Sequence, residues 1–146
     1  MRVVSGIHSS RKLFGYDEKG IRPTMDKVKE SLFAMINSYL KDSICLDLFA
    51  GTGALGIEAI SNNSKHVYFV DNSKNSINVI NKNIESLNLK DNFTIINDNY
   101  TKSLQHFCDN NITFDIIFVD PPYGVIKIEE IINKIIKYNV LNKNGI

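Results

Sequence analysis

The sequence predicts a doubly wound, Rossmann-like α/β fold with a mostly parallel sheet. Short apolar runs alternate with amphipathic helical patterns, and this alternation is typical of a parallel sheet covered by helices. The apolar run at residues 44–48 passes directly into a glycine-rich turn and then a helix, which is the nucleotide-binding element of doubly wound folds. Residues 114–119 are almost continuously apolar, as expected of a strand in the middle of such a sheet.

Residues 1–41 are predicted to form a unit that precedes the sheet. Loosely alternating apolar residues at 2–16 predict a β-hairpin, and the polar stretch 17–20 predicts a turn. From Met25 to Leu40, apolar residues recur every three or four positions, which predicts an amphipathic helix of about four turns. The chain is therefore divided into a hairpin arm with its helix at residues 1–41 and a second unit at residues 42–146.

Four strands are predicted in the second unit. They cover residues 44–48, 66–70, 93–96 and 114–119. The helices that follow them are predicted to begin near Ala54, Ser73, Thr101 and Ile128. With 146 residues, of which 43% are hydrophobic and 23% charged, the chain is one globular domain or most of one.

Charge is distributed unevenly along the chain. Residues 1–41 hold eight Lys or Arg and four acidic residues, a net charge of +4, whereas the other 105 residues carry −3. A basic arm on a mildly acidic body favours a polyanionic partner, although a solvated charged face would give the same counts. The candidate phosphate contacts are Arg11, Lys12, Arg22, Lys27 and Lys29, of which the two lysines of the helix are the weaker candidates.

The glycine turn after the first predicted strand is the candidate ligand site. Gly51 and Gly53 can reach positive φ and leave no Cβ beside a ligand, which could then face the amides of a helix N-terminus. The spacing Gly51-x-Gly53-x-x-Gly56 also fits the dinucleotide fingerprint, a weak signal by itself. Asp47, inside the strand, can meet a cationic group on a ligand. Asp71, at the end of the second strand, can accept hydrogen bonds from both hydroxyls of a ribose or simply cap a helix.

A second motif, Asp120-Pro121-Pro122-Tyr123, follows the apolar run 114–119. Together with the glycine turn it resembles class I S-adenosylmethionine (AdoMet)-dependent methyltransferases, and its form is similar to enzymes that methylate an exocyclic amino group of a nucleobase. Further stretches resemble the bacterial RsmD-type family, the 16S ribosomal RNA guanine-N2 methyltransferases. The matching stretches are residues 2–6, 22–24, 28–33, 46–56 and 120–123, and Arg-Pro-Thr at 22–24 is the most family-specific.

The resemblance implies AdoMet as the cofactor, with its methionine end near Asp47 and its ribose on Asp71. The implied cofactor contacts are Asp47, Phe49, Ala50, Gly51, Gly53, Asp71, Asn72, Asp98 and Asn99. The family often has an acid that accepts a bond from the adenine amino group. Here Asn99 stands at that position with Asp98 beside it, and either residue could supply the acceptor oxygen.

The implied catalytic residues are Asp120, Pro121, Pro122 and Tyr123. A guanine N2 amine is a poor nucleophile, so the site must hold the nitrogen in line with the methyl group and accept its N–H bonds as charge develops. Asp120 offers an acceptor-only carboxylate, and the Pro121 carbonyl is a second acceptor. The prolines stiffen the loop, and Tyr123 can stack on an extruded base.

The resemblance also implies the setting of the enzyme. Residues 1–41 would contact ribosomal RNA or the small-subunit particle, and residues 42–146 would form the AdoMet-binding catalytic domain. The family continues with a fifth strand and a further hairpin, so C-terminal strands are expected to be missing after Ile146. We expect a cytoplasmic monomer without a membrane span, and none of the three histidines shows metal-ligand spacing.

Three other functions fit parts of the pattern. The same chemistry could act on adenine N6 of DNA or on another RNA, because similar enzymes use this motif on adenine. The glycine spacing alone would also fit an NAD(P)-binding oxidoreductase, which Asp47 and the Asp-Pro-Pro-Tyr motif argue against. The abrupt end of the chain would fit a non-catalytic RNA-binding remnant.

Overall fold

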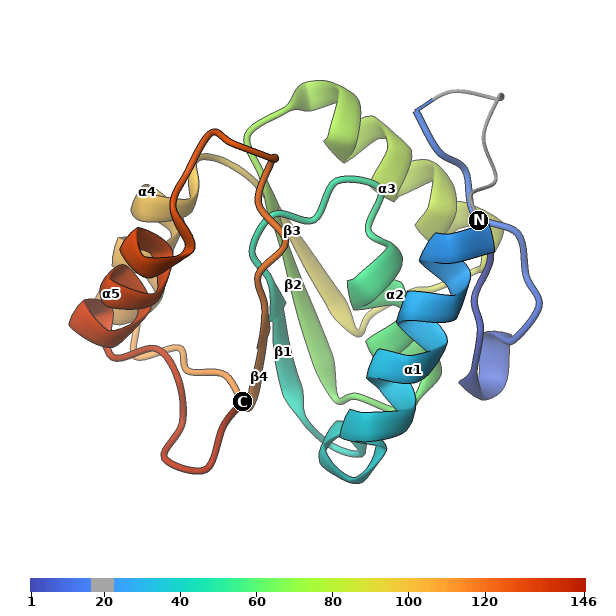
Figure 1. The fold of residues 1–146 in the computed structure, drawn as a ribbon, viewed down its shortest axis with the longest axis horizontal. Coiled ribbons are helices and arrows are strands. Elements are labelled where there is room, and N and C mark those ends of the chain that lie inside the picture. Colours follow the sequence, from blue (N-terminus) through green and yellow to red (C-terminus); the bar gives the residue numbers. More distant parts are fainter. Residues whose placement is uncertain (17–22) are drawn as a thin grey trace.

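Residues 1–16 and 23–146 are described in a computed structural model, and within them a four-stranded parallel sheet forms the centre of the protein (Figure 1). The strands are β1 (Ile44–Asp47), β2 (His66–Asp71), β3 (Phe93–Asn97) and β4 (Ile116–Phe118). Their order is β3-β2-β1-β4, and Leu46 of β1 lies beside Tyr68 of β2 and Ile117 of β4. The order reverses between β1 and β4, which makes that point the crevice where doubly wound sheets bind ligands. The predicted fold class is confirmed.

Helices cover both faces of the sheet (Figure 1). The described helices are α1 (Pro23–Leu40), α2 (Ala54–Ser61), α3 (Lys74–Ser86), α4 (Tyr100–Asp109) and α5 (Ile128–Tyr138). Successive strand residues point to opposite faces, so Cys45 packs in the core under α1–α3, whereas Leu46 packs in the core under α4 and α5. This two-sided burial explains why the strands read as nearly continuous apolar runs.

The N-terminal arm, residues 1–16, pairs with itself only briefly. Arg2 and Lys12 form an isolated antiparallel bridge, and the short helix η1 (Gly6–His8) lies between the two sides of the arm. Val3 and Leu13 are buried in the same core as α1–α3. The predicted hairpin is therefore present as antiparallel pairing, with most of its length used for packing rather than for regular strands.

A buried carboxylate in α2 fixes this arm to the sheet domain. Glu58 is fully buried, and it accepts hydrogen bonds from the backbone N–H groups of Val4 and Ser5. Ser61, one turn later, donates to the Ser5 carbonyl and accepts from the His8 N–H. Because these bonds satisfy the backbone of the arm inside the protein, the arm is an integral layer of the fold.

Helix α1 buries a face that only partly matches the one its periodicity suggests. Leu32, Ile36 and Leu40 pack on the core as expected, and the first turns differ. Lys29, expected on the polar face, is only 4% exposed, and its Nζ donates to the Arg2 carbonyl at 2.5 Å. Burial lowers the pKa of Lys29. Met25 and Val28, expected in the core, are exposed. The apolar arc of the helix is wider than the face that it buries, so the pattern alone does not fix its rotation.

The chain after α5 runs along the free edge of β4. Phe114 and Leu141 form a parallel bridge. The Ile146 N–H then donates to the Asp115 carbonyl, and the Ile117 N–H donates to the Ile146 carbonyl, both at 2.9 Å. These two bonds have the slanted pattern of parallel strand pairing.

Candidate functional site

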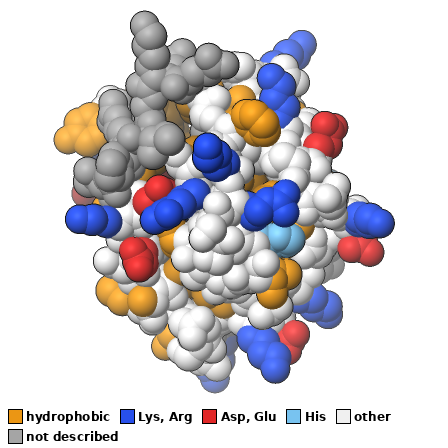
Figure 2. Space-filling view, turned by 90° about the vertical axis from the view of Figure 1, so that its right-hand side faces the viewer, with side chains coloured by type: hydrophobic (Ala, Val, Ile, Leu, Met, Phe, Trp, Pro, Cys, Tyr) orange, Lys and Arg blue, Asp and Glu red, His pale blue; other side chains and the backbone are white. Residues whose placement is uncertain are grey.

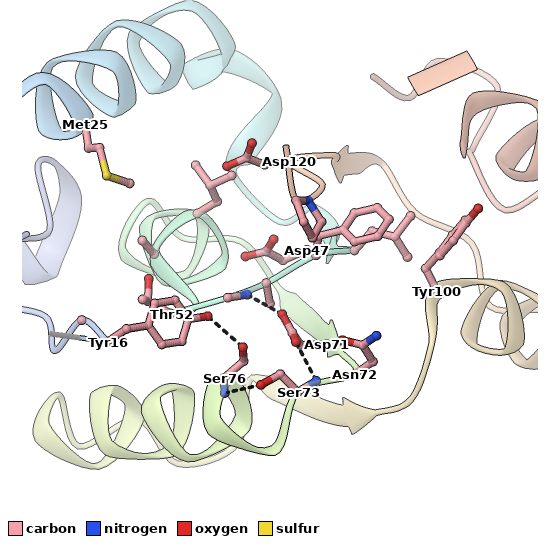
Figure 3. A pocket seen from close by; sticks show the side chains of 18 of the residues that line it. Tyr16, Met25, Asp47, Thr52, Asp71, Asn72, Ser73, Ser76, Tyr100 and Asp120 are labelled. Carbon is pink, nitrogen blue, oxygen red and sulfur yellow. Dashed lines mark hydrogen bonds between the residues drawn. The ribbon is translucent and has the colours of Figure 1, made fainter. Parts of the chain in front are cut away.

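A cavity of about 1150 Å³ opens at the carboxyl ends of the strands, at the point where the strand order reverses (Figure 3). Its walls come from the N-terminal arm, from α1 and from the segments that follow each of the four strands. In Figure 3, Asp47, Asp71 and Asp120 surround its middle, with Tyr16 and Met25 toward one end and Tyr100 toward the other. Ligand sites of small molecules usually measure about 300 to 1000 Å³, so this cavity is large enough for more than one group.

The glycine turn adopts the conformation that its sequence predicts. Gly51 and Gly53 have φ of 56° and 79°, values that favour glycine. Gly51 lines the cavity, whereas Gly53 caps α2 and faces the core side chains of Ile80 and Phe69. A Cβ at Gly56 would lie 2.2 Å from the Phe69 ring, so this third glycine lets α2 approach the sheet closely.

Asp71 uses both carboxylate oxygens to organise the turn. Its Oδ2 accepts the Gly51 N–H at 2.8 Å, and its Oδ1 accepts the Ser73 N–H at 2.9 Å (Figure 3). Each oxygen keeps a second lone pair for a ligand hydroxyl. Asn72 lines the cavity beside it, and Ser73 caps α3 by accepting the Ser76 N–H. The expected helix-capping role therefore belongs to Ser73, and Asp71 faces the cavity.

Asp47 is a fully buried acid with an oxygen toward the cavity. Its Oδ2 accepts the Gly56 N–H at 2.9 Å, and no Lys, Arg or His of the described chain pairs with it. Burial raises the pKa of Asp47 to about 7, helped by the nearby charges of Asp120 and Asp71 and opposed by the Gly56 bond. An acid in this situation is ready to receive a cationic group of a ligand.

The residues after β3 separate into two roles. Asn99 caps α4, because its Oδ1 accepts the Lys102 N–H at 2.8 Å. Asp98 accepts the Asn99 N–H through Oδ1 and has a second carboxylate oxygen with no protein partner among the described residues. Both residues line the cavity. Asp98 is therefore the better placed of the two to accept a bond from a ligand.

The Asp-Pro-Pro-Tyr motif enters the cavity only in part. Asp120 and Pro122 line it, while Pro121 and Tyr123 do not. Tyr123 is fully exposed to solvent. A motif in the sequence cannot specify which way an exposed loop side chain turns, so the expected stacking position of Tyr123 is not realised in this structure.

Several cavity residues were not predicted from the sequence. Tyr16 of the arm lines the cavity, and its hydroxyl lies 2.7 Å from the Ser76 hydroxyl of α3. Tyr100 closes the other end, where its ring lies 5.2 Å from the Phe49 ring and Lys134 contacts its hydroxyl at 3.1 Å. The only available signal was that both tyrosines follow directly on a stretch already assigned to the site or the arm.

The cationic side chains proposed for RNA differ in their exposure. Arg11 and Lys12 are exposed on the arm, although Arg11 also donates to the Ser86 carbonyl at 2.6 Å, and Lys27 is exposed on α1. Lys29 is buried and cannot contact a phosphate, which corrects that assignment. Arg22 lies outside the described residues. Figure 2 shows several Lys and Arg side chains spread over the middle of the face formed by the arm.

Residues 1–16 and 23–146 offer neither a metal cluster nor a membrane span. They contain no group of three or more His, Cys, Asp or Glu side chains that could hold a metal ion. No helix in these ranges has the length and apolar character needed to cross a membrane.

Comparisons with known proteins fit this geometry. The model of the family described as conserved hypothetical protein 95 matches residues 1–146. The ribosomal RNA small subunit methyltransferase D of Haemophilus influenzae is 35% identical over 100% of this chain and 76% of its own length. A Bacillus subtilis protein, provisionally named an rRNA methyltransferase, is 37% identical over 99% of this chain and 79% of its own length.

Solved structures show the same likeness. An H. influenzae protein, provisionally described as a methylase, superposes with a TM-score of 0.75 at 33% identity, covering 97% of this chain and 75% of that one. Because the family model spans the whole chain and the curated relatives exceed 30% identity, the protein belongs to the family described as conserved hypothetical protein 95, with small-subunit ribosomal RNA methyltransferases among its relatives.

Proposed function

We propose that this protein is an AdoMet-dependent methyltransferase that modifies the exocyclic N2 of a guanine in 16S ribosomal RNA. The observation that carries the proposal is the set of three carboxylates, Asp47, Asp71 and Asp120, around one cavity beside the glycine turn. Each has a different chemical task, and the names of the curated relatives support the same reaction class.

The lining of the cavity offers a partner for each polar group of AdoMet. The buried acid Asp47 would bind the ammonium of the methionine part, and the free lone pairs of Asp71 would bind the ribose hydroxyls. Asp98 would accept a bond from the adenine amino group, with Asn72, Phe49 and Ala50 as neighbouring walls. Gly51 leaves room at the turn for the sulfonium end, which supplies an electrophilic methyl group.

Asp120 stands where the acceptor of the methyl group must be held. Its carboxylate would accept an N–H of the guanine amine and fix the N2 lone pair on the line of the carbon–sulfur bond. A bound AdoMet would supply the methyl group, with the electron pair of the carbon–sulfur bond leaving on its sulfur. Asp120 would stabilise the positive charge that develops on the guanine nitrogen, which then loses its proton to solvent.

A guanine edge suits this acceptor better than an adenine edge. Guanine presents two adjacent donors, N1–H and N2–H, whereas adenine presents an acceptor at N1 beside its amino group. An acceptor-only carboxylate therefore favours guanine. The substrate would be 16S ribosomal RNA, either free or in the small-subunit particle. The enzyme would act in the cytoplasm as a monomer, with the exposed cations of its arm toward the phosphates of the RNA.

Calorimetry tests the cofactor part of this proposal. AdoMet and its demethylated product are expected to bind with one site per chain, and Asp71→Ala should weaken both at least tenfold because two ribose hydrogen bonds are lost. NAD should show no binding. Asp109→Ala, an exposed acid on α4 outside the cavity, is the matched control and should bind as the unchanged protein does. Tight NAD binding without AdoMet binding would contradict the assignment of AdoMet as the cofactor.

A further inference from the structure

The cavity has a second, apolar part that the cofactor residues do not use. On the side of α1 and the segment after Asp120, its lining includes Met25, Val28, Pro122 and Val125. Met25, Val28 and Val125 are 48%, 62% and 72% exposed, which is unusual for apolar side chains gathered at one opening. In Figure 3 the Met25 side chain hangs from α1 into the space shared with Asp120.

We propose that Met25 and Val28 of α1 bind one face of the extruded guanine while Asp120 binds its edge. This inference rests on the proposed function and names residues for its nucleobase. The two side chains stand one helical turn apart and present a continuous apolar surface toward the cavity.

The chemistry of a purine matches this part of the cavity. An extruded base has flat apolar faces and a polar edge, so it needs a nonpolar wall together with a hydrogen-bond acceptor. The thioether of methionine is polarizable and packs well against aromatic rings. Lys29 also lines the cavity beside Met25 and Val28, but it is buried and its Nζ donates to the Arg2 carbonyl, so its charge is directed to the arm rather than to a base.

The position of Tyr123 leaves the face of a bound base open to the α1 side chains. Tyr123 is the obvious stacking residue of the motif, yet its side chain is fully exposed and does not line the cavity. Asp120 lines the same cavity as Met25 and Val28, so a base bound at Asp120 would have the α1 side chains as its apolar wall. The rotation of α1 that buries Lys29 is what turns Met25 and Val28 toward the cavity.

Steady-state kinetics tests the proposal with labelled AdoMet and small-subunit particles that lack the modification. Met25→Ala combined with Val28→Ala should raise KM for the particle or lower kcat/KM about tenfold, with the AdoMet dissociation constant unchanged within twofold. Met25→Leu, which restores apolar volume, should recover most of the loss. Met35→Ala is the matched control, because Met35 is exposed on the same helix but outside the cavity.

Two results would overturn the proposal. One is a double variant with the same kcat/KM as Met35→Ala. The other is a double variant that loses AdoMet binding, since α1 would then belong to the cofactor site or to the folding core.

A readout without turnover separates this inference from the proposed reaction. The chain has three methionines, so their labelled methyl groups give three resonances in an NMR spectrum. With the demethylated cofactor saturating, guanosine monophosphate should shift the Met25 signal through the ring current of the bound base and leave the Met35 signal in place. Identical responses of Met25 and Met35 up to saturation would contradict the base wall even if methyl transfer to RNA were observed.

Discussion

Burial changes the acidity of Asp47, which we propose as the partner of the AdoMet ammonium. Its carboxyl is fully buried, and its pKa of about 7 lies well above the ordinary value of 3.8. At pH below about 7 the free protein therefore holds Asp47 mainly in its protonated form. A neutral carboxyl cannot pair with an ammonium, so ligand binding must be coupled to release of this proton.

This coupling predicts a pH dependence of AdoMet affinity. The affinity should rise as pH increases through about 7 and level off above it, and binding below pH 7 should release close to one proton. Calorimetry in buffers of different ionisation enthalpy measures that proton directly. Asp120→Asn removes a nearby negative charge that raises the pKa of Asp47, so it should move the midpoint to lower pH. A midpoint that does not respond to Asp120→Asn would contradict this electrostatic account.

The Asp47 carboxyl affects folding stability in the opposite direction from AdoMet affinity as pH rises. Because the folded pKa lies above the unfolded one, the folded state binds more protons between pH ~4 and pH ~7, and the contribution of Asp47 to stability falls as pH rises through that window. The free protein therefore gives up stability to keep an acid ready for its ligand, a pattern typical of functional sites.

Above pH 7, where Asp47 is ionised, Asp120 is predicted to act on the reaction and not on AdoMet affinity. Asp120→Ala should lower kcat by about a hundredfold, because a hydrogen bond to developing charge is lost. AdoMet affinity at pH 8, where Asp47 is ionised in either protein, should change less than twofold. Single-turnover transfer with bound AdoMet measures the chemical step. Normal turnover by Asp120→Ala would show that the Asp-Pro-Pro-Tyr motif is only structural.

The N-terminal arm packs on the sheet domain and is also proposed to bind RNA. Glu58 and Ser61 of α2 fix its backbone, and Tyr16 reaches from it to Ser76 beside the cavity. The exposed cations Arg11 and Lys12 therefore lie on a layer that is fixed to the sheet domain, outside the cavity. We propose that they bind phosphates around the base that enters the cavity.

The arm is expected to supply phosphate contacts. Arg11→Ala with Lys12→Ala should weaken RNA binding and flatten the log–log salt dependence by somewhat under one unit for each contact removed. Filter binding of small-subunit ribosomal RNA across salt concentrations measures the slope. Lys137→Ala with Lys143→Ala, at exposed positions on or after α5, is the control with the same charge change. Equal slopes for the two double variants would show that the arm is only a structural cover.

The elements differ in how far the sequence could predict them. The glycine turn and the strands were predictable, because their conformation depends on local glycines and on apolar runs that a parallel sheet requires. The rotation of α1 was not, since the residue that it buries, Lys29, is satisfied by the carbonyl of Arg2 far away in the sequence. Tertiary packing also decides which way Tyr123 points and that Tyr16 contacts Ser76. Such packing leaves no periodic pattern in the sequence.

At the scale of the whole molecule, the strand order determines where the site lies. The order β3-β2-β1-β4 brings the residues after four separate strands to one edge, so that Asp47, Asp71, Asp98 and Asp120 share a cavity. The sequence could predict that these carboxylates lie at one edge of the sheet because each follows or ends an apolar strand, whereas their roles toward AdoMet and RNA stay predictions. It left open which residue after β3 faces the ligand, and the N-cap bond of Asn99 now favours Asp98.

Methyl transfer to small-subunit particles that lack N2-methylguanosine tests the proposed reaction most directly. The protein should transfer one labelled methyl group from AdoMet per particle, and nucleoside analysis should recover the label as N2-methylguanosine from a single position of the 16S RNA. Asp120→Ala should reduce this transfer while still binding AdoMet. Label recovered in N6-methyladenosine, or absent from RNA although AdoMet is bound, would contradict the proposed reaction.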